Sequence, residues 1–590
     1  MFDYLIVGAG PSGLCAAKTI RECEPDANVK ILDSNRTVGG VWAKENIYPG
    51  LKTNNLRGGI DFSDFPMHDG FGVRKGEHPS GESMHAYYKA YAERSDLLKL
   101  IDFETYVQEI SRLEGTEGWN LKLNSGSTTD VQTKKLIIAT GVTNHPHRPV
   151  LQDSESFRGP IIHSAELGTK GNLLIKDPEV KTIAVLGGGK SAYDAVHFAG
   201  SSGRRVEWII RKSGKGPEWV FPSHTNIGPI STPRERLTSR RIVSFFSPCL
   251  WKDGFSWIRY FLHFTTLGKL ISQKFWANIH QATLDDCGML KDERTKVLEP
   301  EQSPFWYGTA TGIYCYENDI YEMIKHGQVR VHREDISRLS QGAIGFASGK
   351  TVQADALITA TGFSAKLTLQ FTPSTVHSDL GIPSTSLTPV QHQFWEDLEQ
   401  KADLTIAASF PRLLRGPFKS PSSEIAQPYN PGLDPEMNYT PFRLYRAIAP
   451  PGLTVKGDHS VAFISMFSNQ ANTHRCELQC LWAYAYLNHK LDIDTSTVFE
   501  ETALMTRYVR HRAPYGHGRF FPDLVFDQVP YFDLLLQDLK LRYWRKANIV
   551  AELFDSYLSV DYKGVVQEWL KANNGKTTSE TDPLLSGGKI

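Results

Sequence analysis

Two glycine-rich segments of the chain have the residue types and spacing needed to bind phosphate groups. In the first, Gly8, Gly10 and Gly13 form a GxGxxG motif between an apolar run, DYLIV, and a segment with helical character. Glycine at these positions permits a tight turn and lets backbone N–H groups approach a pyrophosphate at the N-terminus of the helix. Asp33 lies about twenty residues further on, at the end of the next apolar run, where a carboxylate accepts hydrogen bonds from ribose hydroxyls. Because strand, helix and acid occur together, we favour a dinucleotide site over a flexible glycine turn without a ligand.

The second segment reads GGGKSA and matches the GxGxxA variant of the same motif through Gly187, Gly189 and Ala192. The small final residue still allows close packing of helix against strand. Where the first segment offers an acid, the second offers Arg211 and Lys212. A guanidinium pairs with a 2′-phosphate that a carboxylate would repel, so the pattern predicts NADPH rather than NADH. The alternative is that these two cations are only solvated surface charges.

Strand–helix–strand units are needed to position both motifs. After each unit an apolar strand ends in glycine, at Gly141 in KKLIIATG and at Gly362 in DALITATG. This order predicts an α/β fold with two Rossmann-like dinucleotide-binding domains, the second nested within the first. The expected bounds are 1–170 for the first part of the first domain, 171–354 for the second domain with an insertion at about 215–310, 355–572 for the second part of the first domain with a C-terminal helical region, and 573–590 for a disordered tail.

The composition excludes several classes of function. Lys plus Arg and Asp plus Glu each number 65, so the chain lacks the net positive charge that binding to a nucleic-acid backbone needs. Hydrophobic residues make up 40% and charged residues 22%, which is typical of a folded globular chain. The 7 cysteines form no CxxC pair, which argues against a dithiol redox centre and against a zinc site.

Neither a secretory signal nor a membrane span is expected from the sequence. The first predicted strand begins at Phe2, which leaves no room for a signal peptide, and we expect a cytoplasmic protein. The most apolar stretch, FSWIRYFLHF at 255–264, is interrupted by Arg259 and His263 and is too short to span a membrane. Its aromatic residues beside Arg and Lys would suit a substrate lid or a surface helix on a membrane, but most such stretches pack in the core, which we favour.

Three further segments resemble the class B flavin-dependent monooxygenases, which comprise flavin-containing, Baeyer–Villiger and N-hydroxylating enzymes. VGGVW, with Gly40 and Trp42, is similar to the GGxW segment that follows the acid in the family's FAD-binding domain. FRGPIIH at 157–163 is similar to the FxGxxxH fingerprint that the family carries between its two dinucleotide motifs. The resemblance implies FAD at the first motif, with Gly141 beside it, and NADPH at the second. Leu167 stands where the family has an aromatic residue, which leaves the subclass open.

The third segment, YPGLKTNNLRGGIDFSDFP, combines features of two subclasses. Its YPG resembles Baeyer–Villiger enzymes, which carry Asp where this chain has Asn54, whereas the TN pair followed by FSDFP resembles flavin-containing monooxygenases. In the latter enzymes this asparagine sits over the flavin. An uncharged amide can donate a hydrogen bond to a flavin hydroperoxide and keep it protonated. Asn54 is therefore the predicted catalytic residue, and the alternative for an isolated asparagine is an Asx-turn.

The resemblance implies that NADPH reduces FAD, that the flavin forms a C4a-hydroperoxide with O2, and that one oxygen atom passes to a small organic substrate, in the setting of secondary metabolite biosynthesis. Three alternatives remain. A Baeyer–Villiger enzyme would insert the oxygen beside a ketone. A pyridine-nucleotide disulfide reductase shares the nested plan but needs the CxxC that is missing here. A non-catalytic FAD-binding protein is disfavoured because the glycines of both motifs are intact.

Overall fold

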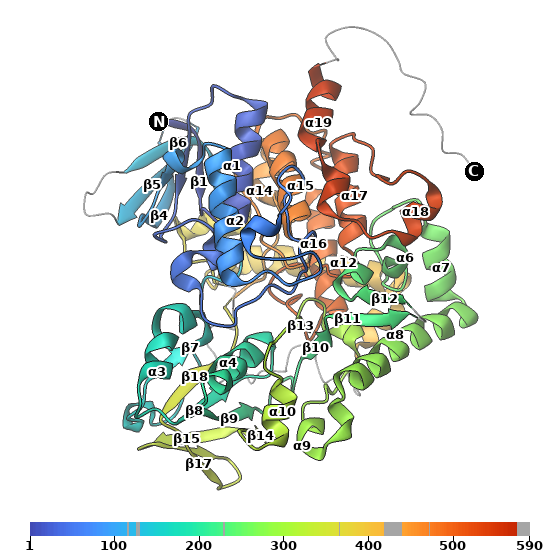
Figure 1. Ribbon diagram of the computed structural model, residues 1–590. Coiled ribbons are helices and arrows are strands. Elements are labelled where there is room, and N and C mark those ends of the chain that lie inside the picture. Colours follow the sequence, from blue (N-terminus) through green and yellow to red (C-terminus); the bar gives the residue numbers. More distant parts are fainter. Residues whose placement is uncertain are drawn as a thin grey trace.

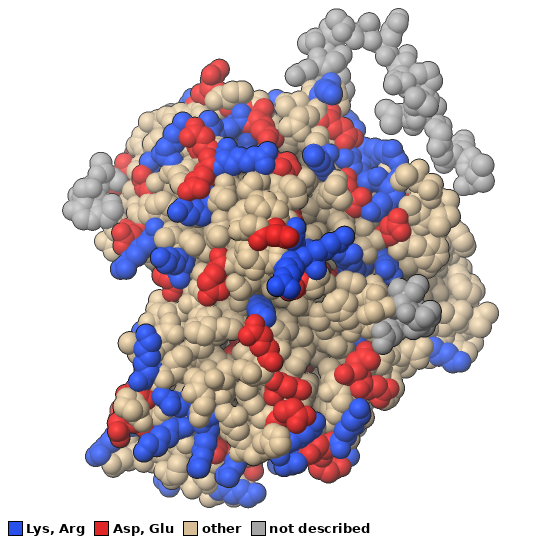
Figure 2. Space-filling model, viewed as in Figure 1, with Lys and Arg blue, Asp and Glu red and all other residues tan. Residues whose placement is uncertain are grey.

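The computed structural model describes residues 1–114, 117–124, 130–227, 230–364, 366–417, 439–470 and 472–574. The predicted tail at 573–590 therefore lies outside the described residues from 575 onward. The chain is a mixed α/β protein with two main sheets, which lie in the upper and lower halves of Figure 1. On the face that Figure 2 shows, the basic and acidic side chains of the described residues are interspersed over both halves.

The first sheet surrounds the N-terminal strand. Its strand order is β19-β4-β5-β6-β1-β2-β3, and β20 pairs with β6. Strands parallel to β1 lie on both sides of it, and an antiparallel β4–β5–β6 meander extends the sheet on one side. Helix α1 (Pro11–Cys23) follows β1 and packs against α15 (Asn472–Leu487). The strands are β1 (Phe2–Val7), β2 (Val29–Leu32), β3 (Ile101–Asp102), β4 (Tyr106–Arg112), β5 (Trp119–Asn124), β6 (Val131–Ile138), β19 (Gln370–Thr372) and β20 (Val461–Phe463).

The second sheet is entirely parallel, in the order β14-β9-β8-β18-β7. Its central strands are largely apolar and buried because parallel sheets are covered on both faces. Helices α4 (Lys190–Ser201) and α10 (Ile320–Lys325) pack against it and against each other. The strands are β7 (Ile161–His163), β8 (Thr182–Leu186), β9 (Arg205–Ile210), β14 (Val329–Arg333) and β18 (Ala356–Thr359).

The strand pairing differs from the expected domain bounds in two places. Strand β7 precedes residue 170 and β18 follows residue 355, yet both pair within the second sheet. The chain returns to the first sheet only at β19, which pairs with β4. A short apolar run carries no mark of which sheet it joins, because its partner strands are distant in sequence. These two strands therefore pair across the bounds drawn from the glycine motifs alone.

The predicted insertion contains its own small elements. Hairpin helices α7 and α8 form the right-hand edge of Figure 1. In α7, Leu262 and Arg259 are buried, whereas Trp257 is 71% and Tyr260 63% exposed, so this apolar stretch is only partly core. Among the described residues, no helix is both long and apolar enough to cross a bilayer. The elements are β10 (Trp219–Pro222), β11 (His224–Ile227), β12 (Ile230–Pro233), α5 (Glu235–Thr238), α6 (Arg241–Ser244), α7 (Ser256–Phe264), α8 (Thr266–Cys287) and α9 (Glu293–Lys296), with β13 (Thr311–Tyr314) pairing on β10.

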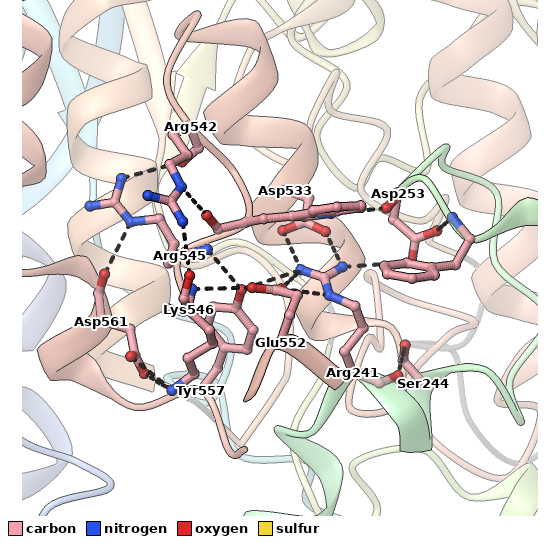
Figure 3. Close-up of polar contacts among 12 residues, drawn as sticks. Arg241, Ser244, Asp253, Asp533, Arg542, Arg545, Lys546, Glu552, Tyr557 and Asp561 are labelled. Atoms are coloured by element: carbon pink, nitrogen blue, oxygen red, sulfur yellow. Dashed lines mark hydrogen bonds and ion pairs between the residues drawn. The ribbon is translucent and has the colours of Figure 1, made fainter. Parts of the chain in front are cut away.

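A buried ionic cluster joins the insertion to the C-terminal helices. Arg241 of α6 is 0% exposed and points between Asp533 of α17 (Gln528–Asp538) and Glu552 of α18 (Ile549–Phe554), as Figure 3 shows. Its Nη2 donates to Asp533 Oδ1 at 3.1 Å, and its Nε donates to Glu552 Oε1 at 2.8 Å. Asp253, also buried, lies 3.7 Å from Arg241 Nη1 and pairs with Arg259 at 2.6 Å. The cluster therefore pairs charged groups of the insertion with charged groups of the C-terminal helices.

Replacing Arg241 with methionine is expected to destabilise the protein strongly. The side chain keeps its volume, but Asp533 and Glu552 lose their shared cation inside the core. Breaking a buried pair in this way costs about 3–5 kcal/mol. Denaturant unfolding followed by tryptophan fluorescence measures the loss, and R330M, at an exposed site of β14, is the matched control, with an effect within about 0.5 kcal/mol. Equal unfolding midpoints for R241M and the wild-type protein would contradict the expectation.

Candidate functional site

The first glycine turn has no room for a larger residue at Gly8 or Gly13. Strand β1 ends at Val7, and Gly8 adopts a φ of +112° that L side chains rarely take. A Cβ on Gly8 would lie 2.7 Å from the carbonyl oxygen of Ala139, and one on Gly13 would lie 1.8 Å from the carbonyl oxygen of Gly8. Gly8, which directly follows β1, and the first turn of α1 are thus in direct backbone contact.

The other residues predicted for this motif gather at the same edge of the first sheet. Asp33, just beyond β2, accepts the Ala9 N–H through Oδ2 at 2.5 Å and the Asn35 N–H through Oδ1 at 2.7 Å. Burial raises the pKa of Asp33, against the effect of these two hydrogen bonds. A short 3-10 turn from Gly40 to Trp42 brings Gly40 against the turn, since a Cβ there would lie 3.2 Å from the Cα of Gly10.

Two neighbouring loops present buried polar atoms to this edge without a partner among the described residues. They are Thr140 Oγ1, in the loop after β6, and both amide atoms of Asn469, in the loop after β20. The β20 loop reaches the first turn of α1, where Ser465 Oγ lies 2.5 Å from Ser12 Oγ. Buried groups without hydrogen bonds are costly, and a polar ligand would satisfy them. Gly141, with a φ of +74° and nothing within 4 Å of a Cβ, borders open space here. The residues present therefore fit a bound dinucleotide.

The second glycine turn has the same backbone contacts at the carboxyl edge of the second sheet. A Cβ on Gly187 would lie 2.3 Å from the carbonyl oxygen of Ala360, and Ala192 is fully buried in α4. Gly189 is the N-cap of α4. Arg211 and Lys212 follow the end of β9, with Arg211 partly buried and Lys212 exposed. The predicted residues of the second motif are therefore brought together too.

Glu218 lies against this second turn and was not predicted from the sequence. Its N–H donates to the Gly188 carbonyl at 2.9 Å, and its Oε2 lies 2.3 Å from where a Cβ on Gly189 would be. Burial raises the pKa of this carboxyl group to about 7, while Lys215 acts in the opposite direction. The second glycine of the motif is where the backbone approaches a pyrophosphate, so the carboxyl group occupies that approach. Glu218 lies outside every motif, and only the fold brings it here.

Asn54 is joined to β13. Its Oδ1 accepts the Ile313 N–H at 3.2 Å, and its side chain is partly buried. The next residue, Asn55, is buried and donates from Nδ2 to Glu235 Oε2 at 2.7 Å. Beside Asn55 lies a small pocket of about 20 Å³, whose lining includes Glu235, Gln470, His474, Gln528 and Tyr557. Glu235 is a second site residue without any sequence signal.

His163, the last residue of the fingerprint segment, is fully buried where β7 ends. Its Nδ1 accepts the Ala165 N–H at 3.1 Å, and its ring meets Phe363 edge-on with the centroids 5.5 Å apart. Burial lowers the pKa of His163 to about 4, so the imidazole is neutral at physiological pH. These contacts indicate that His163 packs its own segment against the one that carries Phe363.

Comparisons with known proteins agree with this geometry. Residues 5–234 match the family model described as pyridine nucleotide-disulphide oxidoreductase, although all seven cysteines, among them Cys476 and Cys480, are free thiols. The chain is also similar in fold to S-allyl-L-cysteine S-oxygenase from Allium sativum, at 14% identity and a TM-score of 0.50, over 98% of this chain and 95% of that one.

Full-length relatives are more informative. The chain is 32% identical to an FAD-dependent monooxygenase of Aspergillus sclerotiorum over 591 residues, covering 98% of this chain and 99% of the relative. It is also 32% identical to an FAD-dependent monooxygenase of Aspergillus nomiae over 594 residues, with the same coverage of both chains. The resemblance of its motifs to class B flavin monooxygenases is confirmed, and the chain belongs to the family of FAD-dependent monooxygenases.

Proposed function

We propose that this protein is a monooxygenase that uses FAD and NADPH to transfer one oxygen atom from O2 to a small organic substrate. The observation that carries the proposal is the presence of two closed glycine turns, each at the carboxyl edge of its own sheet within one chain. An enzyme of this type must bring two dinucleotides together. The fungal origin of the full-length relatives supports a role in tailoring a secondary metabolite.

FAD is assigned to the first turn. Gly8, Gly10 and Gly13 would receive its pyrophosphate at the N-terminus of α1, and Asp33 would bind its ribose. The 3-10 turn of Gly40 and Trp42, the Gly141 loop and the unpartnered Asn469 amide would contact the rest of the cofactor. Bound FAD supplies the oxygen activation, and the protein's part is to bind, orient and exclude water.

NADPH is assigned to the second turn, in a domain nested within the FAD-binding one. Gly187, Gly189 and Ala192 would hold its pyrophosphate, and Arg211 with Lys212 would select the 2′-phosphate. The return of β19 and β20 to the first sheet after the second sheet is complete supports the nesting. Glu218 must move aside or be protonated when the nucleotide binds, since two negative groups would otherwise meet at Gly189.

Asn54 is proposed as the catalytic residue. The Ile313 N–H holds its amide oxygen, which leaves the Nδ2 hydrogens as the donors that face other groups. A neutral donor beside the flavin can orient the oxygen being transferred by a hydrogen bond, without the positive charge that would strongly favour its deprotonated form.

The Gly13→Ala variant is expected to purify with little FAD. Its new methyl group would overlap the Gly8 carbonyl, which is backbone and cannot swing aside. We expect FAD affinity to fall by more than about tenfold, or about 1.4 kcal/mol, as read from the ratio of flavin to protein absorbance. Gly457→Ala, in an exposed turn with open space around the glycine, is the control that should retain FAD. Full flavin content in both variants would argue that the first turn does not bind FAD.

The Glu218→Gln variant is expected to bind NADPH more tightly at alkaline pH. Because burial raises the pKa of Glu218 to about 7, the group is largely neutral at pH 6 and ionised at pH 8. Wild-type affinity for NADPH should therefore fall as pH rises through 7, and the variant should bind about tenfold better at pH 8 but alike at pH 6. Comparing the NADPH affinities of the variant and the wild-type protein at each pH cancels the effect of the nucleotide's own titration. Parallel pH profiles would show that Glu218 does not oppose the nucleotide.

The Asn54→Ala variant is expected to release hydrogen peroxide faster than the wild-type protein. Loss of one positioned donor should raise the rate of peroxide release without substrate by about tenfold or more. Peroxide and NADPH assays on FAD-loaded protein measure this rate, because each NADPH oxidised without substrate yields one peroxide. Asn278→Ala, on the exposed side of α8, serves as the control. An unchanged rate with full FAD content would remove Asn54 from the proposed chemistry.

A further inference from the structure

Glu235 is a buried carboxyl group that the insertion places against the loop carrying Asn54. It is the first residue of α5 and is 8% exposed. Its Oε1 accepts the Leu56 N–H at 2.9 Å, and its Oε2 accepts Asn55 Nδ2 at 2.7 Å. One side chain thus binds both residues that follow Asn54.

The loop is shaped to receive this carboxyl group. A Cβ on Gly59 would lie 3.0 Å from Glu235 Oε1, which is tighter than ordinary contact. On the other side of the loop, His78 Nδ1 lies 3.2 Å from the Asn55 carbonyl, and its Nε2 lies 2.6 Å from Ser223 Oγ of the insertion. Burial lowers the pKa of His78 to about 4, so the ring is neutral and bridges the two segments through hydrogen bonds.

The same short helix also holds the loop that follows β20. Thr238 of α5 donates to Gln470 Oε1 at 2.8 Å, and Asn55 Nδ2 donates to the Gln470 carbonyl at 3.1 Å. Gln470 directly follows Asn469, whose buried amide has no partner among the described residues. Helix α5 therefore joins the Asn54 loop to a loop at the carboxyl edge of the first sheet.

A buried carboxylate is an expensive way to fill space. Arg236 and Asp61 are the charged groups that act on Glu235 through space, with opposite effects, and His474 and Tyr557 line the same pocket. Well-packed apolar residues usually stabilise a core as well as buried charges do, so a carboxylate in this position is best explained by the geometry that it imposes.

We propose that Glu235 is a positioning residue for oxygen transfer, which fixes the Asn55–Leu56 backbone and so holds Asn54 in register with β13. The proposal rests on the proposed role of Asn54. It gives the insertion a part in the chemistry: Asn54 is held through its own amide by Ile313 and through the next two residues by Glu235.

The test compares Glu235→Gln with Glu293→Gln, its match in the same insertion. Glu293 is likewise the first residue of a four-residue helix, α9, but its side chain is 87% exposed. In E235Q the amide can still accept from Leu56, but its NH2 group faces the NH2 group of Asn55. The readouts are FAD content, hydrogen exchange of the peptide covering 53–60, and the rate of peroxide release without substrate.

We expect E235Q to retain FAD and its KM for NADPH, to exchange the Leu56 amide faster, and to release peroxide without substrate about tenfold faster than E293Q. Glu235→Asp, which keeps the carboxyl group, should recover part of the slow release. Faster exchange with unchanged peroxide release would overturn the positioning role. If N54A also leaves peroxide release unchanged, the proposed role of Asn54 is rejected together with that of Glu235. If N54A releases peroxide faster and E235Q does not, only the proposed role of Glu235 is rejected.

Discussion

The contact between the end of β1 and the first turn of α1 is the constraint on which the rest of the structure depends. Only a glycine at position 13 allows the helix to start against the Gly8 carbonyl. That contact aims the N-terminus of α1 at the carboxyl edge of the sheet, where the partial positive charge of the helix favours anions. The loops after β2, β6 and β20 begin at the same edge, because β1, β2, β6 and β20 run parallel.

The two glycine turns share this geometry and differ in their charges. At the first turn, the Asp33 carboxylate is bound by backbone N–H groups and lies beyond the next strand. At the second, cations follow the equivalent strand, and the Glu218 carboxyl group lies over the turn itself. A carboxyl group that burial makes reluctant to ionise is a mild obstacle at neutral pH and a stronger one as pH rises. The same backbone motif can thus support one nucleotide site without such an obstacle and another whose obstacle depends on pH.

The insertion is held in place by buried ionisable groups at two points. Arg241 bonds to α17 and α18, and Glu235 bonds to the Asn54 loop. Both groups give up hydration, and each regains hydrogen bonds in only one arrangement of the segments around it. This requirement for a full set of partners explains how a segment with no large sheet of its own can have a definite position relative to residues near both ends of the chain.

Much of this protein was determined by the sequence alone. The strands, turns and helices around Gly8–Gly13 and Gly187–Ala192, and the acid or cations at the next strand end, could be predicted because they are local patterns in which spacing dictates geometry. Tertiary structure decided what local patterns do not contain. The sheet that β7 and β18 join, the approach of Glu218 to Gly189 and the bonds of Glu235 to Asn55 and Leu56 all depend on residues distant in sequence. A single carboxyl group carries no pattern of its own, and its burial and its partners exist only once the distant segments have packed.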